Sequence, residues 1–225
     1  ATPDDTFFNL QWHYEQIGLP RAWDLTTGSD EVIVAVVDSG VLTNHPDLTA
    51  KLTSTGYDFV SDVNSAGDGD GIDGDPDDPG DQANQGGSSS FHGTHVAGTV
   101  AAATQNNSGV AGAGWQTLVM AIRALGLNGQ GVDYDIAQGI RYAAGLPNDS
   151  GLIPDRPADI INLSLGGRTN SQLIAEAVQE ARDQGVIIIA AAGNNSSSQP
   201  NYPAANAGVV SVSAVDFSAD LAFYS

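Results

Sequence analysis

The chain has 225 residues, 41% of them hydrophobic, and carries 27 acidic against 7 basic residues, a net charge of −20. This length and apolar content suffice for one substantial core, and we expect a single domain. The negative charge opposes binding to nucleic acid or to an anionic membrane, and no apolar run reaches the ~18 residues of a membrane span, so we expect neither partner.

Five apolar runs predict the strands of a buried sheet. Each run is continuously apolar and does not alternate with polar residues, which is typical of parallel strands covered on both faces. The runs span residues 32–37, 118–124, 159–164, 186–192 and 209–215.

Helical patterns fall between these runs. Residues 171–185 place Leu173, Ile174, Ala177, Val178 and Ala181 on one face, with Asn170 or Ser171 as N-cap and Gly185 just past the end. Residues 132–145 and the stretch from His92 also predict helices. The alternation predicts an α/β fold, with a mostly parallel sheet between two helical layers and a site beyond the carboxyl ends of the strands.

Asp38 follows the first apolar run, in "VIVAVVDSG". A buried carboxylate is costly without a partner, and an imidazole that gains charge during a reaction is one such partner. The alternative is that Asp-Ser-Gly forms an ordinary turn in which Asp38 accepts bonds from its own backbone.

Two histidines lie three residues apart in "FHGTHVAGTVAAA". His92 begins the expected helix, whose positive end disfavours imidazolium, so it is a candidate base that stays neutral until an anion supports its charge. We expect His95, one turn deeper among apolar residues, to be structural. The spacing does not match the four-residue offset of a zinc-binding H-E-x-x-H pair.

The stretch "AAAGNN" follows the fourth run. The Asn194 amide could donate to an oxyanion, and the small residues around Gly193 leave room for a substrate. Taken alone, Gly-Asn is also compatible with a simple turn.

Together, the motifs "VAVVDSGVLTNHPDL", "HGTHVAGTVAA", "INLSLGG" and "AAAGNN" resemble the subtilisin-like serine proteases, the subtilases. The resemblance runs from Gln11 to Val215. It implies an extracellular, monomeric endopeptidase in which Asp38 orients the imidazole, His92 is general base and then acid, and Asn194 stabilises the oxyanion.

The resemblance also implies a groove that binds polypeptide substrates as an added strand, with broad specificity. The groove would lie between residues 125–131 and 164–167, and Asn201 would lie near the base of the primary pocket. The substrate-binding residues so implied are Gly126, Gly129, Gly131, Ser164, Leu165, Gly166, Ala191, Gly193 and Asn201.

The family's nucleophile motif, a Gly-Thr-Ser-Met-Ala-like turn, does not occur in the sequence. Ser39, Ser164 and Ser225 do not fit a nucleophile served by His92. The chain is therefore expected to be the N-terminal and central part of one catalytic domain. The serine would come from a docked C-terminal fragment of the same enzyme after a nick, or the chain is a truncated segment.

Asp provides 23 of the 27 acids, and many lie between Tyr57 and Phe91, a segment with few apolar residues to bury. Such a loop is either disordered or held by a ligand. Clustered carboxylates separated by glycines resemble a calcium loop, and a solvated acidic loop is the alternative. The expected Ca²⁺ ligands are Asp68, Asp70, Asp73, Asp75 and Asp78.

The resemblance implies a second Ca²⁺ site formed by Gln11, Asp47 and the loop 104–112, with Asn107 as a ligand. The chain has no cysteine, which excludes disulfides and thiolate metal sites. This absence does not indicate a compartment, because an exported protein can use calcium in place of disulfides. The competing hypothesis is a catalytically silent, acidic calcium-binding module on a degenerate protease fold. A nucleotide-binding enzyme is disfavoured because no phosphate loop is present.

Overall fold

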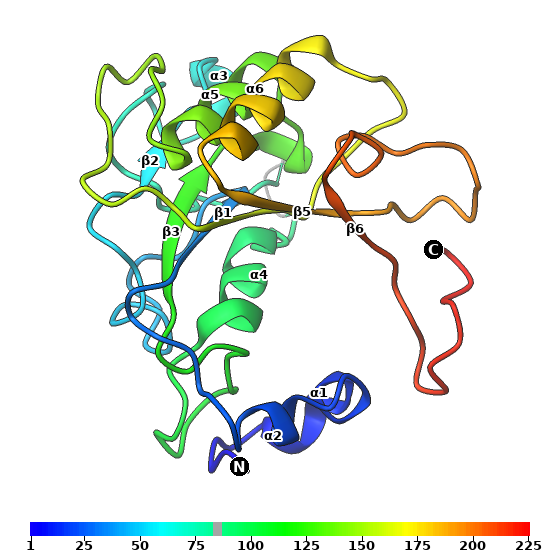
Figure 1. Cartoon of the computed structure of the whole chain (residues 1–225). Coiled ribbons are helices and arrows are strands. Elements are labelled where there is room, and N and C mark those ends of the chain that lie inside the picture. The colour runs from blue at the N-terminus through cyan, green and yellow to red at the C-terminus, as the bar shows by residue number, and fades with distance from the viewer. Residues whose placement is uncertain (83–86) are drawn as a thin grey trace.

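Six parallel strands form one sheet in the order β2-β3-β1-β4-β5-β6 (Figure 1). The computed structural model describes residues 1–82 and 87–225. The strands are β1 (Ile33–Asp38), β2 (Tyr57–Asp58), β3 (Leu118–Arg123), β4 (Ile160–Leu163), β5 (Ile187–Ala191) and β6 (Val210–Val212). All five predicted strands occur: β1 has the length of its apolar run but lies one residue later, the other four are shorter than their runs, and β2 was not predicted.

Strand β1 occupies the centre of the sheet, and all six of its residues are buried. It pairs with β3 from Ile33 opposite Leu118 to Asp38 opposite Arg123, and with β4 on its other side. Burial on both faces explains why this run is continuously apolar. The register brings Asp38 and Arg123 side by side at the carboxyl edge.

Helices cover both faces of the sheet, which confirms the predicted three-layer α/β fold (Figure 1). Helices α5 (Asp133–Ala143) and α6 (Gln172–Asp183) pack over one face. Helix α4 (His92–Ala101) packs on the other face against β1 and β3. Leu173, which we expected on the buried side of α6, is 41% exposed, because the buried stripe begins one residue later at Ile174.

Short elements complete the chain: η1 (Phe8–Leu10), α1 (Trp12–Gln16), α2 (Leu19–Ala22), α3 (Val63–Ala66) and η2 (Leu127–Gly129). Tyr14 of α1 and Trp23 pack on Ala111 in a separate small core. No helix within residues 1–82 and 87–225 is long and apolar enough to cross a membrane.

The face of β5 and β6 on the side of α4 has no helix packed against it among the described elements. Ile187, Val210 and Val212 are each about half exposed there, at 52%, 49% and 50%. Phe217 and Phe223, in the segment that follows β6, are 75% and 90% exposed. Three apolar side chains of β5 and β6 therefore lie on an uncovered part of the sheet, and the segment after β6 adds two more exposed aromatic side chains.

Candidate active site

Asp38 and His92 meet at the carboxyl edge of the sheet. Nδ1 of His92 lies 2.8 Å from Oδ1 and 2.9 Å from Oδ2 of Asp38. The Asp38 side chain is fully buried, whereas that of His92 is 49% exposed. Because Nδ1 is engaged by the carboxylate, Nε2 is the ring nitrogen left for a second partner.

The pKa of His92 is raised above its ordinary value, chiefly by its hydrogen bond with Asp38 and against the opposing effect of burial. Asp81 adds a further attractive charge. His92 is also the first residue of α4, whose positive end disfavours the imidazolium. The carboxylates thus support a charge that the helix alone would oppose.

His95, which we expected to be structural among the apolar residues of its helix, does not lie in the core. It is exposed on α4, and its charge lowers the pKa of the nearby His13, which burial lowers as the larger cause. The apolar neighbours in sequence do not bury His95, because the buried residues of α4 are Gly93, Ala97 and Ala101, on another side of the helix.

A cleft of about 730 Å³ extends from His92. One side is formed by Leu125 and residues 128–131 and the other by Ser164 to Arg168, which belong to the two segments expected to flank a substrate. Of the residues implied for substrate binding, the cleft includes Gly129, Gly131, Ser164, Leu165 and Gly166. Asp38 and Asp81 line the same cleft as His92, and the charges of both carboxylates act on its imidazole.

Gly126 and Gly131 are required by backbone packing. A Cβ at Gly126 would lie 2.2 Å from the Ser65 carbonyl oxygen, and one at Gly131 would lie 2.3 Å from that of Ala124. Gly129 instead has a φ of +62°, which favours glycine in its turn. Gly129 and Gly131 line the cleft directly, whereas Gly126 holds the same segment against Ser65.

Asn201 lies between two predicted walls of the primary pocket. Its Nδ2 donates to the Ala191 carbonyl at 3.1 Å. A Cβ at Gly166 would lie 2.5 Å from this Nδ2, and one at Gly193 would lie 3.1 Å from its Cγ. Asn201 and Gly193 line a second cavity of about 400 Å³ rather than the cleft of His92, and Asn194 is exposed just after β5.

The acidic segment contributes a buried charge network, contrary to the expectation that it has little to bury. Phe59, Val60 and Ala66 are almost fully buried. Arg123, 1% exposed, forms ion pairs with Asp58 and Asp68 and donates to the Ala66 carbonyl. The few apolar residues suffice because the arginine anchors the segment to the sheet.

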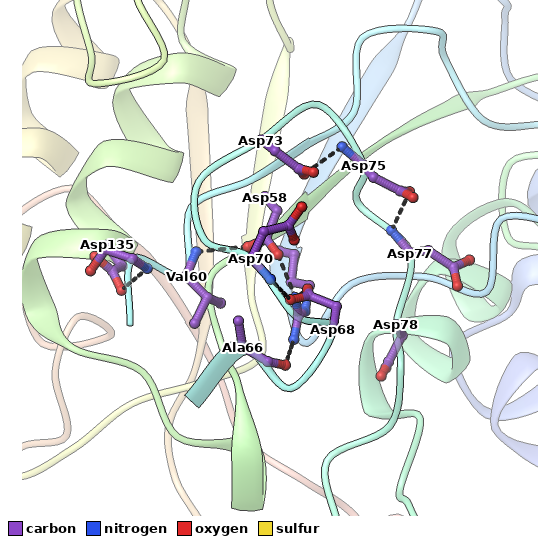
Figure 2. A network of polar contacts seen from close by, with 12 residues as sticks. Asp58, Val60, Ala66, Asp68, Asp70, Asp73, Asp75, Asp77, Asp78 and Asp135 are labelled. Atoms are coloured by element: carbon purple, nitrogen blue, oxygen red, sulfur yellow. Dashed lines mark hydrogen bonds and ion pairs between the residues drawn. The ribbon is translucent and has the colours of Figure 1, made fainter. Parts of the chain in front are cut away.

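Burial raises the pKa of Asp58 to about 7, although the Val60 amide and Arg123 act in the opposite direction. Figure 2 shows Asp58, Asp68 and Asp70 in this network, with Asp78 pointing away from them. Asp58 and Arg123 were not singled out in the sequence, because their pairing depends on the register of β2 with β3.

Several expected calcium ligands of the acidic segment already have protein partners. The backbone amides of Asp70, Asp75 and Asp77 each bond the aspartate two residues earlier. Both carboxylate oxygens of Asp78 accept hydrogen bonds. Within the described ranges, no three acidic, histidine or cysteine side chains gather as a metal-binding group.

The other expected calcium site has a buried carboxylate. Asp47 is 5% exposed, and its oxygens accept from the Asn106 amide and from the backbone N–H of Val110. Gln11 holds the same loop by accepting from the Ala111 N–H at 2.8 Å. Asp5, not singled out in the sequence, is equally buried and accepts from the Gln105 N–H.

Comparison with known proteins gives concordant matches. Residues 29–225 match the model of the subtilase family. The chain is 41% identical to an extracellular protease of Xanthomonas campestris pv. campestris, covering 100% of this chain and 40% of the relative. It is 36% identical to thermitase of Thermoactinomyces vulgaris, over 96% of this chain and 66% of thermitase. It is 41% identical to halolysin of Haloferax mediterranei, over 100% of this chain and 38% of halolysin.

Among solved structures, the proteases from Pseudoalteromonas arctica match with a TM-score of 0.92 and 44% identity, covering 100% of this chain and 69% of that one. The chain thus spans about two fifths to two thirds of the length of these curated relatives.

Proposed function

The chain belongs to the subtilase family, and on that basis we propose that it is the N-terminal and central part of the catalytic domain of an extracellular serine endopeptidase. The observation that carries the proposal is the contact of half-exposed His92 with buried Asp38 in the lining of the cleft. Names of relatives such as extracellular protease and halolysin support secretion and peptide hydrolysis.

In the proposed reaction, His92 takes a proton from a serine hydroxyl through Nε2 as the serine oxygen attacks the peptide carbonyl. Asp38 accepts the Nδ1–H bond and supports the imidazolium. His92 then returns the proton to the leaving amine as the C–N bond breaks, which leaves the acyl group on the serine. A water molecule that gives its proton to His92 attacks this ester, the acid is released, and the proton goes back to the serine oxygen. Asn194 donates a hydrogen bond to the oxyanion, and residues 125–131 and 164–167 hold the substrate as an extended strand.

We propose that the serine belongs to polypeptide that packs on the uncovered face of β5 and β6. The half-exposed Ile187, Val210 and Val212 support this, since a parallel sheet normally has both faces covered. Exposed Phe217 and Phe223 provide further apolar surface in the segment after β6. The sheet face thus has the chemistry of a surface for a helix of the same enzyme.

Calcium is proposed at Asp47, with Gln11 and Asn107 as neighbouring ligands. A buried carboxylate is costly without positive charge, and among the described residues only Asn106 and Val110 donate to Asp47. In the acidic segment, Asp70 and Asp73 are better candidates for calcium ligands than Asp78. The charge of Asp73 raises the pKa of Asp70, and a bound cation would relieve the repulsion between the two carboxylates. Calcium would brace these loops and take no part in hydrolysis.

A fluorophosphonate probe tests the proposed function. The protein as isolated is treated with the probe, separated under denaturing conditions and analysed by mass spectrometry. We expect a labelled serine outside residues 1–225 and hydrolysis of unstructured polypeptides, both abolished in His92→Ala. An intact, folded preparation that neither reacts nor cleaves peptides would instead favour a catalytically silent calcium-binding module.

A further inference from the structure

The Ser39 hydroxyl connects three segments around the Asp38–His92 pair. It accepts a hydrogen bond from the Gly93 backbone N–H at 3.0 Å and donates to Oδ2 of Asp78 at 2.8 Å. The Ser39 backbone N–H donates to Oδ1 of Asp38 at 2.8 Å. One residue therefore contacts the buried carboxylate, the start of α4 and the acidic segment.

Helix α4 lacks a local N-cap. Phe91 occupies the N-cap position with a φ of 48°, and no side chain caps the helix there. The first N–H groups of a helix need partners from outside its own hydrogen-bond ladder. Ser39, 2% exposed, supplies such a partner to Gly93, the residue directly after His92.

Asp78 fixes the orientation of that hydroxyl. It is 2% exposed, and its second oxygen accepts from the Gly80 N–H at 2.8 Å. A carboxylate can only accept, so Ser39 must donate to Asp78 and keep a lone pair for the Gly93 N–H. The direction of both bonds is therefore determined by the chemistry of the groups.

Close backbone packing holds the same segments in register. The Val41 N–H donates to the Pro76 carbonyl at 3.0 Å. A Cβ on Gly93 would lie 2.1 Å from the Gly40 carbonyl oxygen, and one on Gly40 would lie 2.7 Å from that of Pro76. Small displacements of residues 76–78 would thus reach the start of α4 through direct contact.

We propose that Ser39 and Asp78 are positioning residues that hold His92 against Asp38, so that the acidic segment sets the geometry of the catalytic pair. This inference rests on the proposed function for its catalytic meaning, but the geometry it concerns is independent of the nucleophile. Asp78 does not line the cleft, and Ser39, which does, is only 2% exposed. Both act through the start of α4 and through the residue next to Asp38.

The test is an NMR titration of the His92 imidazole in the protein as isolated, with the four histidines assigned by single His→Gln variants. Ser39→Ala removes the acceptor for Gly93 without changing charge. Asp78→Asn keeps the shape but offers one acceptor oxygen to two donors. We expect each variant to lower the His92 pKa by about 0.5–1 unit, because the bond to the charged imidazolium weakens.

Asp77→Asn is the matched control. It removes one charge from the adjacent residue of the same segment, where Asp77 accepts from the N–H and hydroxyl of Thr43 and does not touch Ser39. We expect its effect on the His92 pKa to stay below about 0.2 unit. A shift in Asp78→Asn alone, with none in Ser39→Ala, would indicate a simple charge effect and overturn the proposal.

Circular dichroism confirms that each variant is folded, and Asp78→Asn carries the test if Ser39→Ala does not fold. An unchanged His92 pKa in folded Ser39→Ala, or in folded Asp78→Asn if that variant alone folds, refutes the positioning role. In active enzyme we also expect Ser39→Ala and Asp78→Asn each to lower kcat roughly tenfold and to leave KM unchanged. Because the titration needs no peptidase activity, absence of activity would refute the proposed function separately.

Discussion

Removing the buried Arg123 guanidinium should destabilise the protein strongly. In Arg123→Met, Asp58 would keep a buried charge without its cation, and the Ala66 carbonyl would lose its donor. Breaking a buried ion pair from one side costs about 3–5 kcal/mol. We expect the free energy of unfolding at pH 8 to fall by this amount, a large share of the ~5–15 kcal/mol that stabilises typical domains.

The assay is urea unfolding followed by fluorescence of the three tryptophans. The matched control is Arg141→Met, whose ion pair with Glu180 lies at the surface and should contribute no more than about 1 kcal/mol. Adding Asp58→Asn to Arg123→Met should recover part of the loss, because the amide still accepts from the Val60 N–H. A loss below about 1 kcal/mol, or two losses that simply add, would refute the reasoning.

Three further predictions concern pH and metal. The pKa of Asp58 is raised from 3.8 to about 7 on folding, so the folded state binds this proton more tightly than the unfolded state. The resulting contribution to the free energy of unfolding is fully present below pH 4 and is lost as the pH rises through 7. In Asp58→Asn, the free energy of unfolding measured in urea titrations should therefore change less over that pH range. Asp38→Asn should move the acid limb of the pH–rate profile to lower pH, because the hydrogen bond with Asp38 raises the His92 pKa. It should also lower kcat by about 10⁴-fold. An acid limb that does not move would contradict the pairing of Asp38 with His92. EDTA should lower the melting temperature, because calcium at 100 times its Kd adds about 2.7 kcal/mol to the free energy of unfolding. Asp47→Asn should make the melting temperature less sensitive to EDTA. A melting temperature that EDTA leaves unchanged counts against bound calcium.

The sequence predicts the central strands well because their environment is uniform. Residues of β1 are buried on both sides, so a continuous apolar run is sufficient evidence for the strand. Strand β2 has only two residues and leaves no periodic signal. Asp38 and His92 could be paired in advance because each belongs to a recognisable motif at the end or start of an element.

Contacts between distant segments could not be predicted in the same way. Arg123 reaches Asp58 and Asp68 across more than 50 residues of sequence. Nothing in the composition of residues 57–82 distinguishes an aspartate that pairs with arginine from one that faces solvent. The exposure of His95 likewise depends on which elements cover α4, and helical periodicity does not report that.

The register explains why Arg123 and Asp38 can be neighbours without forming a pair. Asp58, Arg123 and Asp38 occupy matching positions on β2, β3 and β1, on the face that packs against α4. Adjacent strands lie about 4.8 Å apart, so an uncommitted guanidinium could compete with His92 for the Asp38 carboxylate. Asp58, Asp68 and the Ala66 carbonyl instead draw the guanidinium away. The acidic segment therefore contributes to the site electrostatically, because it leaves the buried carboxylate of Asp38 to the imidazole.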